Sequence, residues 1–207
     1  MAEPKPRRAT YQDVLDAPPN MIAEIFDGEL VLSPRPAGFH NRVNGELFAE
    51  LRAPFDRGRG GPGGWILMIE PELHVGPDIV VPDIAGWRRE RMPVVTNAPY
   101  FTIVPDWICE VLSKSTEKDD RSRKLAIYAR EGVSHAWLVN PRLRTLEVLQ
   151  LRDGKWVMLG VYRDDQRVRA EPFDVIELEL AVLWEAFAPE PPPTRAAEPA
   201  ATYEPAP

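Results

Sequence analysis

The stretch DWICEVLSKSTEKDDRSRKLAIYAREGVSHAWLVN, residues 106–140, constrains the fold more than any other part of this chain. It predicts a strand at 106–112, a helix at 117–131 and a second strand that ends before Pro141, and Gly132 stands where a glycine commonly ends a helix. A helix between two strands favours a parallel pairing, because parallel neighbours need a long crossover connection. We therefore expect a parallel strand pair with a helix packed on it.

Two hairpins are expected beside this pair. The segments AEIFDGELVLS and TLEVLQLRDGKWVMLGVY each hold two apolar runs around an Asp-Gly dipeptide, at residues 27–28 and 153–154. Asp-Gly between two strands is a strong hairpin signal. Residues 65–87 predict two or three further strands, and residues 41–51 predict a helix with one apolar face. The sequence thus predicts an α/β fold, a mixed β-sheet flanked by helices, with antiparallel hairpins.

One domain is expected between two polar ends. Residues 1–9 predict a flexible N-terminus, and residues 188–207 predict a disordered tail because they are rich in Pro, Ala and Glu and nearly lack aliphatic side chains. The domain at 10–187 opens with a short helix, for which Thr10 and Asp13 have the spacing of a capping box.

Charge and hydropathy restrict the location and the partners of the chain. With a formal net charge of −7, the chain lacks the excess of basic residues that nucleic-acid-binding proteins usually show. No apolar run approaches the ~20 residues that span a bilayer, so no membrane contact is expected. The single cysteine, Cys109, excludes an internal disulfide, and no apolar segment follows the basic residues near the start. These features favour the cytoplasm.

Two acidic residues stand within apolar, strand-like segments. Asp83 lies in IVVPDIAGW and Glu110 lies in WICEVLS. An ionised carboxylate is costly to bury unless it is paired or bound to a metal. Either residue alone would most simply point outward from a strand edge. Two such residues on central strands instead favour a functional site.

Lys124 is the candidate partner of these two acids. It precedes Leu125 on the predicted helix and lies near the Tyr128 side of the buried stripe, at its boundary, from which it could reach along the sheet. Asp120 stands four residues earlier, in the order that favours an ion pair. The simpler alternative is therefore a solvated surface pair of Asp120 and Lys124.

The order of these residues resembles a known nuclease pattern. Pro82-Asp83, then a strand glutamate and a lysine, is similar to the PD-(D/E)xK motif, although Leu112 occupies the usual lysine position. The longer segments EVLSKST, DRSRKLAIYAREGVSHAWLVNP, VVPDIAGW and AEIFDGELVLSPRPAGFH resemble the Uma2 family, also called DUF820, over about residues 11–184. In that family the lysine is moved onto the following helix, which makes it Lys124.

This resemblance implies a restriction-endonuclease-like fold and a metal-dependent endonuclease that cleaves DNA. Asp83 and Glu110 would bind Mg²⁺ or Mn²⁺ together with the backbone carbonyl of Val111, because hard cations prefer oxygen ligands. Lys124 would orient or help deprotonate the attacking water and offset the developing negative charge. Glu110 would interrupt its strand because a metal site must be held on rigid backbone.

Three further residues match the resemblance as accessory positions, and two of them have a simpler alternative. Glu24 would be a further metal or water ligand, or it would face solvent. His40 would contact phosphate or substrate, or it would be an ordinary residue of the first helical turn. Asp120 would orient Lys124 or Arg121.

Other features leave alternatives open. A set of basic residues would form a rim for nucleic acid or would be ordinary surface residues: Arg88, Arg89, Arg91, Lys114, Arg121 and Arg123. The chain would be either the nuclease or a non-catalytic nucleic-acid-binding or regulatory module on a nuclease-like scaffold. Cleavage of both strands of DNA would favour a homodimer, for which the apolar hairpin at 145–162 is the candidate interface.

Overall fold

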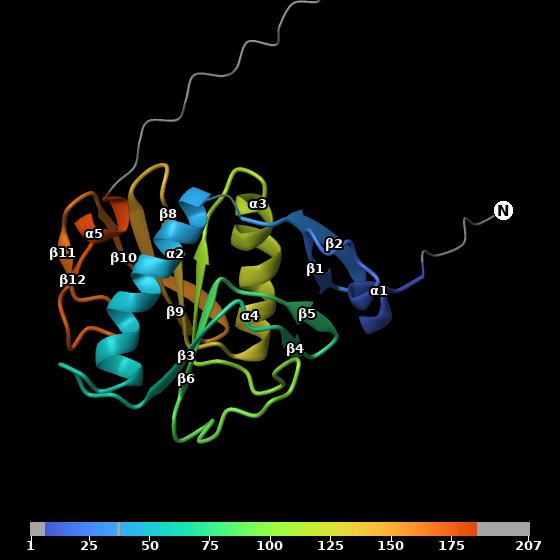
Figure 1. Cartoon of the computed structure of the whole chain (residues 1–207), viewed down its shortest axis with the longest axis horizontal. Coiled ribbons are helices and arrows are strands. Elements are labelled where there is room, and N and C mark those ends of the chain that lie inside the picture. Colours follow the sequence, from blue (N-terminus) through green and yellow to red (C-terminus); the bar gives the residue numbers. More distant parts are fainter. Residues whose placement is uncertain (1–6, 37, 186–207) are drawn as a thin grey trace, which may run out of the picture.

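A computed structural model of the chain describes residues 7–36 and 38–185 (Figure 1). Most of the predicted flexible segment at 1–9 and all of the predicted tail at 188–207 lie outside the described residues. Within the described ranges, no helix is long and apolar enough to cross a membrane.

The largest element is a six-stranded mixed sheet. From one edge to the other its strands are β10 (Lys155–Arg163), β9 (Thr145–Arg152), β8 (His135–Asn140), β7 (Trp107–Val111), β6 (Ile84–Arg88) and β3 (Trp65–Ile69). The pair β7–β8 is parallel, and the other neighbours are antiparallel. The prediction of a parallel crossover within a mixed sheet is therefore confirmed.

The crossover helix has a local irregularity. It consists of α3 (Glu117–Asp119), a π-helical turn at Asp120–Lys124 and α4 (Leu125–Glu131). Gly132 ends it in the left-handed conformation with φ 84°, as predicted. The sequence predicted one uniform helix, whereas the π turn holds both Asp120 and Lys124. Single π turns inside helices are frequent at functional sites.

A second sheet of four antiparallel strands lies beside the first. Its strands are β2 (Glu29–Pro34), β1 (Met21–Phe26), β5 (Asp78–Val80) and β4 (Leu73–Val75), in that order. The chain leaves this sheet after β5 and enters the large sheet at β6, so residues 81–83 connect the two sheets. The sequence predicted Asp83 inside a strand, and this prediction was wrong. Asp83 instead ends the connection, directly before β6.

The remaining elements are short. The two predicted Asp-Gly turns join β1 to β2 and β9 to β10, and all four turn residues have positive φ. The capping box of Thr10 and Asp13 forms at α1 (Tyr11–Leu15). Helix α2 runs over Gly38–Leu51 and continues as a π-helical turn at Arg52–Asp56. A small hairpin of β11 (Arg167–Val168) and β12 (Leu178–Glu179) precedes α5 (Ala181–Trp184).

The core lies on both faces of the large sheet. Helices α2 and α5 contribute to an apolar cluster on one face, and α4 contributes to a second cluster on the other (Figure 1). Along β7, Cys109 belongs to the first cluster and Ile108 to the second. Cys109 is thus a buried core residue, as predicted, and the neighbouring Glu110 faces the α4 side.

Candidate active site

Glu110 lies in β7, and both of its carboxylate oxygens have side-chain partners. Its side chain is 2% exposed. Tyr128 donates a hydrogen bond to Glu110 Oε1 at 2.6 Å, and Lys124 Nζ lies 2.9 Å from Oε1 and 3.0 Å from Oε2. The charged residue in the most strand-like segment is therefore compensated by two side chains of the crossover helix.

Lys124 lies deeper than the sequence predicted. Its side chain is 6% exposed, so it is neither at the boundary of the buried stripe nor part of a solvated surface pair. Besides its contact with Glu110, its ammonium group donates to the carbonyl of Val81 at 3.0 Å. Nζ also lies 3.4 Å from Glu24 Oε1 and 3.7 Å from Asp120 Oδ1. One cation is thus shared among three carboxyl groups.

Glu24 joins this cluster from β1 of the smaller sheet. Its side chain is buried, which rules out the solvent-facing alternative. Glu24 Oε1 accepts a hydrogen bond from the backbone N–H of Val81 at 2.8 Å, while the carbonyl of Val81 accepts from Lys124. The connection between the two sheets is therefore held by the same groups that neutralise the site.

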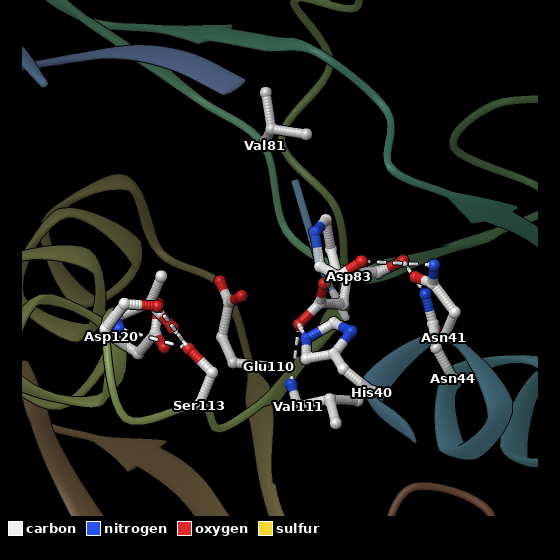
Figure 2. Close-up of polar contacts among 12 residues, drawn as sticks. His40, Asn41, Asn44, Val81, Asp83, Glu110, Val111, Ser113 and Asp120 are labelled. Carbon is white, nitrogen blue, oxygen red and sulfur yellow. Dashed lines mark hydrogen bonds and ion pairs between the residues drawn. The ribbon is translucent and has the colours of Figure 1, made fainter. Parts of the chain in front are cut away.

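Asp83 forms the second half of the site with residues of α2 (Figure 2). Its Oδ2 atom accepts a hydrogen bond from the backbone N–H of Val111 at 2.6 Å and lies 3.2 Å from Nε2 of His40. Asn44, one turn further along α2, donates to the backbone carbonyl of Asp83 at 3.4 Å. His40 is thus buried against a predicted metal ligand and is more than an ordinary first-turn residue.

Burial and mutual charge shift the pKa values of this cluster. Burial raises the pKa of Glu110 well above its usual range, against the effect of Lys124. Burial also raises the pKa of Asp120 to about 6, again opposed by Lys124. Burial alone would lower the pKa of Lys124, but the carboxylates, Glu110 first, outweigh it and raise that pKa. For His40, burial is likewise outweighed by Asp83, so its pKa is raised.

These residues lie at one cavity of about 830 Å³. Five acidic side chains line it: Glu24, Asp83, Glu110, Asp119 and Asp120. Lys124 lies among them, and four exposed basic side chains complete the charged lining: Arg35, Lys114, Arg142 and Arg144. The buried acidic floor would attract a cation, and the exposed basic groups would attract an anion.

The basic residues proposed from the sequence contribute little to this cavity. Of that set, only Lys114 lines it. The guanidinium of Arg88 lies over the ring of Trp65 at 4.1 Å, and Arg91 Nη1 is 2.6 Å from Asp106 Oδ1. These two arginines are therefore ordinary surface residues with local structural partners, the simpler of the two alternatives.

Three participants were missed by the sequence analysis. The hydroxyl of Tyr128, the main chain of Val81 and the amide of Asn44 all contact the predicted site residues. Tyr128 was assigned only to the buried stripe, and the role of Val81 has no side-chain signal. Asn44 had one signal, since it lies four residues after His40 on the buried face of a helix, where an amide needs a partner.

No three His, Cys, Asp or Glu side chains of the described ranges come together as a group that could hold a metal ion. The two predicted ligands, Asp83 and Glu110, therefore form no such group with a third side chain of these ranges. This small set matters because Mg²⁺ commonly binds only one or two carboxylates and keeps several waters.

Comparison with protein families identifies the family of this chain. Residues 9–182 match the model of the Uma2 family, described as "Putative restriction endonuclease". The chain belongs to the Uma2 family. The resemblance inferred from the sequence is thereby confirmed, and the match includes every candidate residue of the site.

One solved structure supports the fold of this Uma2 protein. It is the crystal structure of a "putative nuclease belonging to DUF820" from Anabaena variabilis ATCC 29413. The TM-score is 0.69 at 22% sequence identity, and the alignment covers 85% of this chain and 97% of the other. This similarity confirms the predicted fold class. No curated protein matches the chain.

Proposed function

We propose that this Uma2 protein is a metal-dependent endonuclease that hydrolyses DNA phosphodiester bonds. The observation that carries the proposal is the buried contact between Lys124 and Glu110 beside Asp83, at a cavity with basic groups at its exposed margin. A protein that only bound nucleic acid would not need a buried cluster of carboxylates around one lysine, because such clusters are costly to desolvate.

The donor chemistry fits a hard divalent cation. Each carboxylate oxygen can accept about two hydrogen bonds. Glu110 Oε1 accepts from Lys124 and Tyr128, whereas among the described residues Lys124 is the one donor to Oε2, which leaves capacity there. Asp83, Glu110 and the carbonyl of Val111 would hold Mg²⁺ or Mn²⁺. When bound, the cation would lower the pKa of a water molecule and polarise a phosphoryl oxygen.

The side chains around this position would divide the remaining work. Because its pKa is raised, Lys124 stays protonated at neutral pH and would act as a hydrogen-bond donor and a positive charge, not as a base. Asp120 lines the same cavity with a pKa of about 6, so its carboxylate is mostly ionised at neutral pH. A group with a pKa near the working pH is suited to accept a proton from water.

Nicking of supercoiled plasmid in Mg²⁺ or Mn²⁺ tests this proposal. Glu110→Gln keeps the shape and part of the hydrogen bonding of the side chain, so it should fold and lose at least about 100-fold in rate. Lys124→Ala should lose activity as well. Glu46→Gln is the matched control, because Glu46 pairs with Arg42 on the surface of α2, 2.6 Å away, outside the cavity. Equal cleavage by all four proteins would identify a contaminant and refute the proposal.

Metal binding can be measured without activity. A cation that binds the folded protein stabilises it, by about 2.7 kcal/mol at a concentration 100 times its Kd. Thermal unfolding should therefore shift upward with Mn²⁺ in the wild type and much less in Asp83→Asn. An equal response of both proteins at millimolar Mn²⁺ would contradict the assignment of Asp83 as a ligand and favour the non-catalytic module. The homodimer expected from double-strand cleavage stays a prediction.

A further inference from the structure

We propose that Lys114 binds a phosphate next to the scissile one, so that this site takes a polynucleotide with consecutive phosphates. The inference rests on the proposed nuclease function and specifies its substrate class and one binding residue. Three observations carry it: the position of Lys114 at the cavity, the fixed turn on which it stands, and the partners that the other basic groups of the exposed margin already have.

Lys114 stands close to the predicted metal ligands. It is exposed and lines the cavity of about 830 Å³ together with Asp83 and Glu110. It stands three residues after Val111, and three residues of chain span at most about 10 Å. A lysine side chain at this distance can reach a phosphate one nucleotide away from a scissile phosphate held at the acidic floor of the cavity.

The turn that carries Lys114 is held by hydroxyl groups on both sides of it. Ser113 Oγ lies 2.9 Å from Ser115 Oγ and 2.9 Å from Thr116 Oγ1. Ser113 Oγ also accepts a hydrogen bond from the backbone N–H of Thr116 at 3.2 Å. These contacts fix the backbone around Lys114 and leave its own side chain exposed. An ordered turn loses less conformational entropy when it binds a ligand.

Lys114 is the basic group of the exposed margin that is most available to an anion. The three arginines of the margin each have a partner: Arg142 with Glu117, Arg144 with Asp164, and Arg35 with the carbonyl of Pro19. Among the described residues, the ammonium group of Lys114 has no ion pair or hydrogen bond, although Asp119 lines the same cavity. Lysine commonly binds phosphate as a point charge.

Two substrates and a matched lysine test the inference. Cleavage of a DNA fragment in Mn²⁺ is compared with hydrolysis of bis(p-nitrophenyl) phosphate, which has one phosphodiester and no neighbouring phosphate. The control is Lys118→Ala, because Lys118 is exposed on the same helix and does not line the cavity. Lys114→Ala should raise KM for DNA about tenfold with little change in kcat, and its loss on DNA should exceed its loss on the small substrate at least about fivefold.

The outcomes separate this inference from the proposed function. An equal KM for DNA in Lys114→Ala and Lys118→Ala would overturn the phosphate contact and leave the nuclease standing. An equal loss on both substrates would also overturn it, because Lys114 would then act on the scissile phosphate itself. Lys114→Arg keeps the positive charge and should recover most of the loss on DNA.

Binding decides the inference if the wild type cleaves neither substrate, a result that would refute the nuclease. Anisotropy of a labelled DNA fragment in EDTA is then measured between about 50 and 200 mM salt. Lys114→Ala should bind more weakly than Lys118→Ala, and the slope of log affinity against log salt should become shallower by about 1. This result would support the phosphate contact. Equal affinities and slopes of the two variants, or no binding by the wild type, would overturn it.

Discussion

The two faces of β7 carry opposite kinds of core. On one face Trp107 packs edge-on against Trp137 and Phe173, with ring centroids 5.2 Å and 4.9 Å apart. On the other face, three residues along the same strand, Glu110 contacts a buried lysine. Both regions are almost fully shielded from water. They differ in the effect of burial on stability. Burial stabilises the apolar face, whereas on the charged face the cost of removing charges from water must be offset by pairing.

This difference shows which face exists for stability. Burial of apolar side chains stabilises the folded state by roughly 25 cal/mol per Å² of surface removed from water. A buried ion cluster often stabilises a fold less than apolar residues of the same volume would. The sheet could therefore close on α4 without Glu110 and Lys124. Their retention inside an otherwise apolar cluster is better explained by the chemistry of the cavity.

The largest expected effect is on the apolar face. Trp107→Ala should lower the free energy of unfolding by about 4 kcal/mol, because it leaves a large cavity beside two aromatic rings. Urea denaturation measures the loss. The variant protein that remains folded should keep its activity, in contrast to Glu110→Gln in the same strand. A loss below about 1 kcal/mol would mean that this face does not dominate stability.

A somewhat smaller loss is expected when the charged face is broken. Lys124→Met should destabilise the fold by about 3 kcal/mol, because it leaves the carboxyl groups of Glu24, Glu110 and Asp120 without their cation. Adding Glu110→Gln should then cost less than it does in the wild type, since the carboxylate it removes is already unpaired. A double-mutant cycle measures this coupling. Strictly additive losses would contradict a shared buried cluster.

The third prediction concerns pH. The pKa of Asp120 is raised from 3.8 in the unfolded chain to about 6 in the fold, so the folded state holds this proton more tightly. The resulting stability is present below pH 3.8 and is lost as pH rises through about 6. The wild type should therefore lose about 3 kcal/mol relative to Asp120→Asn over this range, with no further change above it. Parallel pH profiles of the two proteins would show that Asp120 does not titrate in this way.

The smallest effect should come from the surface of the same helix. Arg121 stands three residues before Lys124, but its side chain is 35% exposed and pairs with Glu147 and Glu117. Pairs exposed to water contribute little, so Arg121→Ala should cost about 1 kcal/mol or less, and added salt should reduce the difference. Thermal unfolding at low and high salt measures both. A loss as large as that of Lys124→Met would remove the distinction between the buried and exposed cations.

Local chemistry made much of the fold predictable. The Asp-Gly turns, the capping box and Gly132 each depend on the conformational preferences of a few neighbouring residues, and all three predictions are confirmed. The parallel crossover followed from the strand–helix–strand pattern. The division of the strands into separate sheets was not predictable, because short-range preferences do not determine which strands pair, and residues 79–87 are apolar except for Asp83.

The site was predictable in residue type more than in position. Asp83, Glu110 and Lys124 were predicted because charged groups in apolar surroundings need a reason, and the structure brings all three to one cavity. Their roles as ligands and water-orienting group stay predictions. The depth of Lys124 was misjudged because the sequence analysis assumed a uniform helix, whereas the π turn at Asp120–Lys124 changes the phase of the side chains.

The sequence by itself determined the turns, the crossover and the identity of the charged residues, because these depend on short-range preferences and on the cost of burying charge. Only the tertiary structure decided which partners meet. Glu24 reaches Lys124 from a strand 100 positions away in the chain, and Val81 joins them through its main chain. Such contacts depend on how two sheets pack, and packing is a property of the whole fold that no single segment encodes.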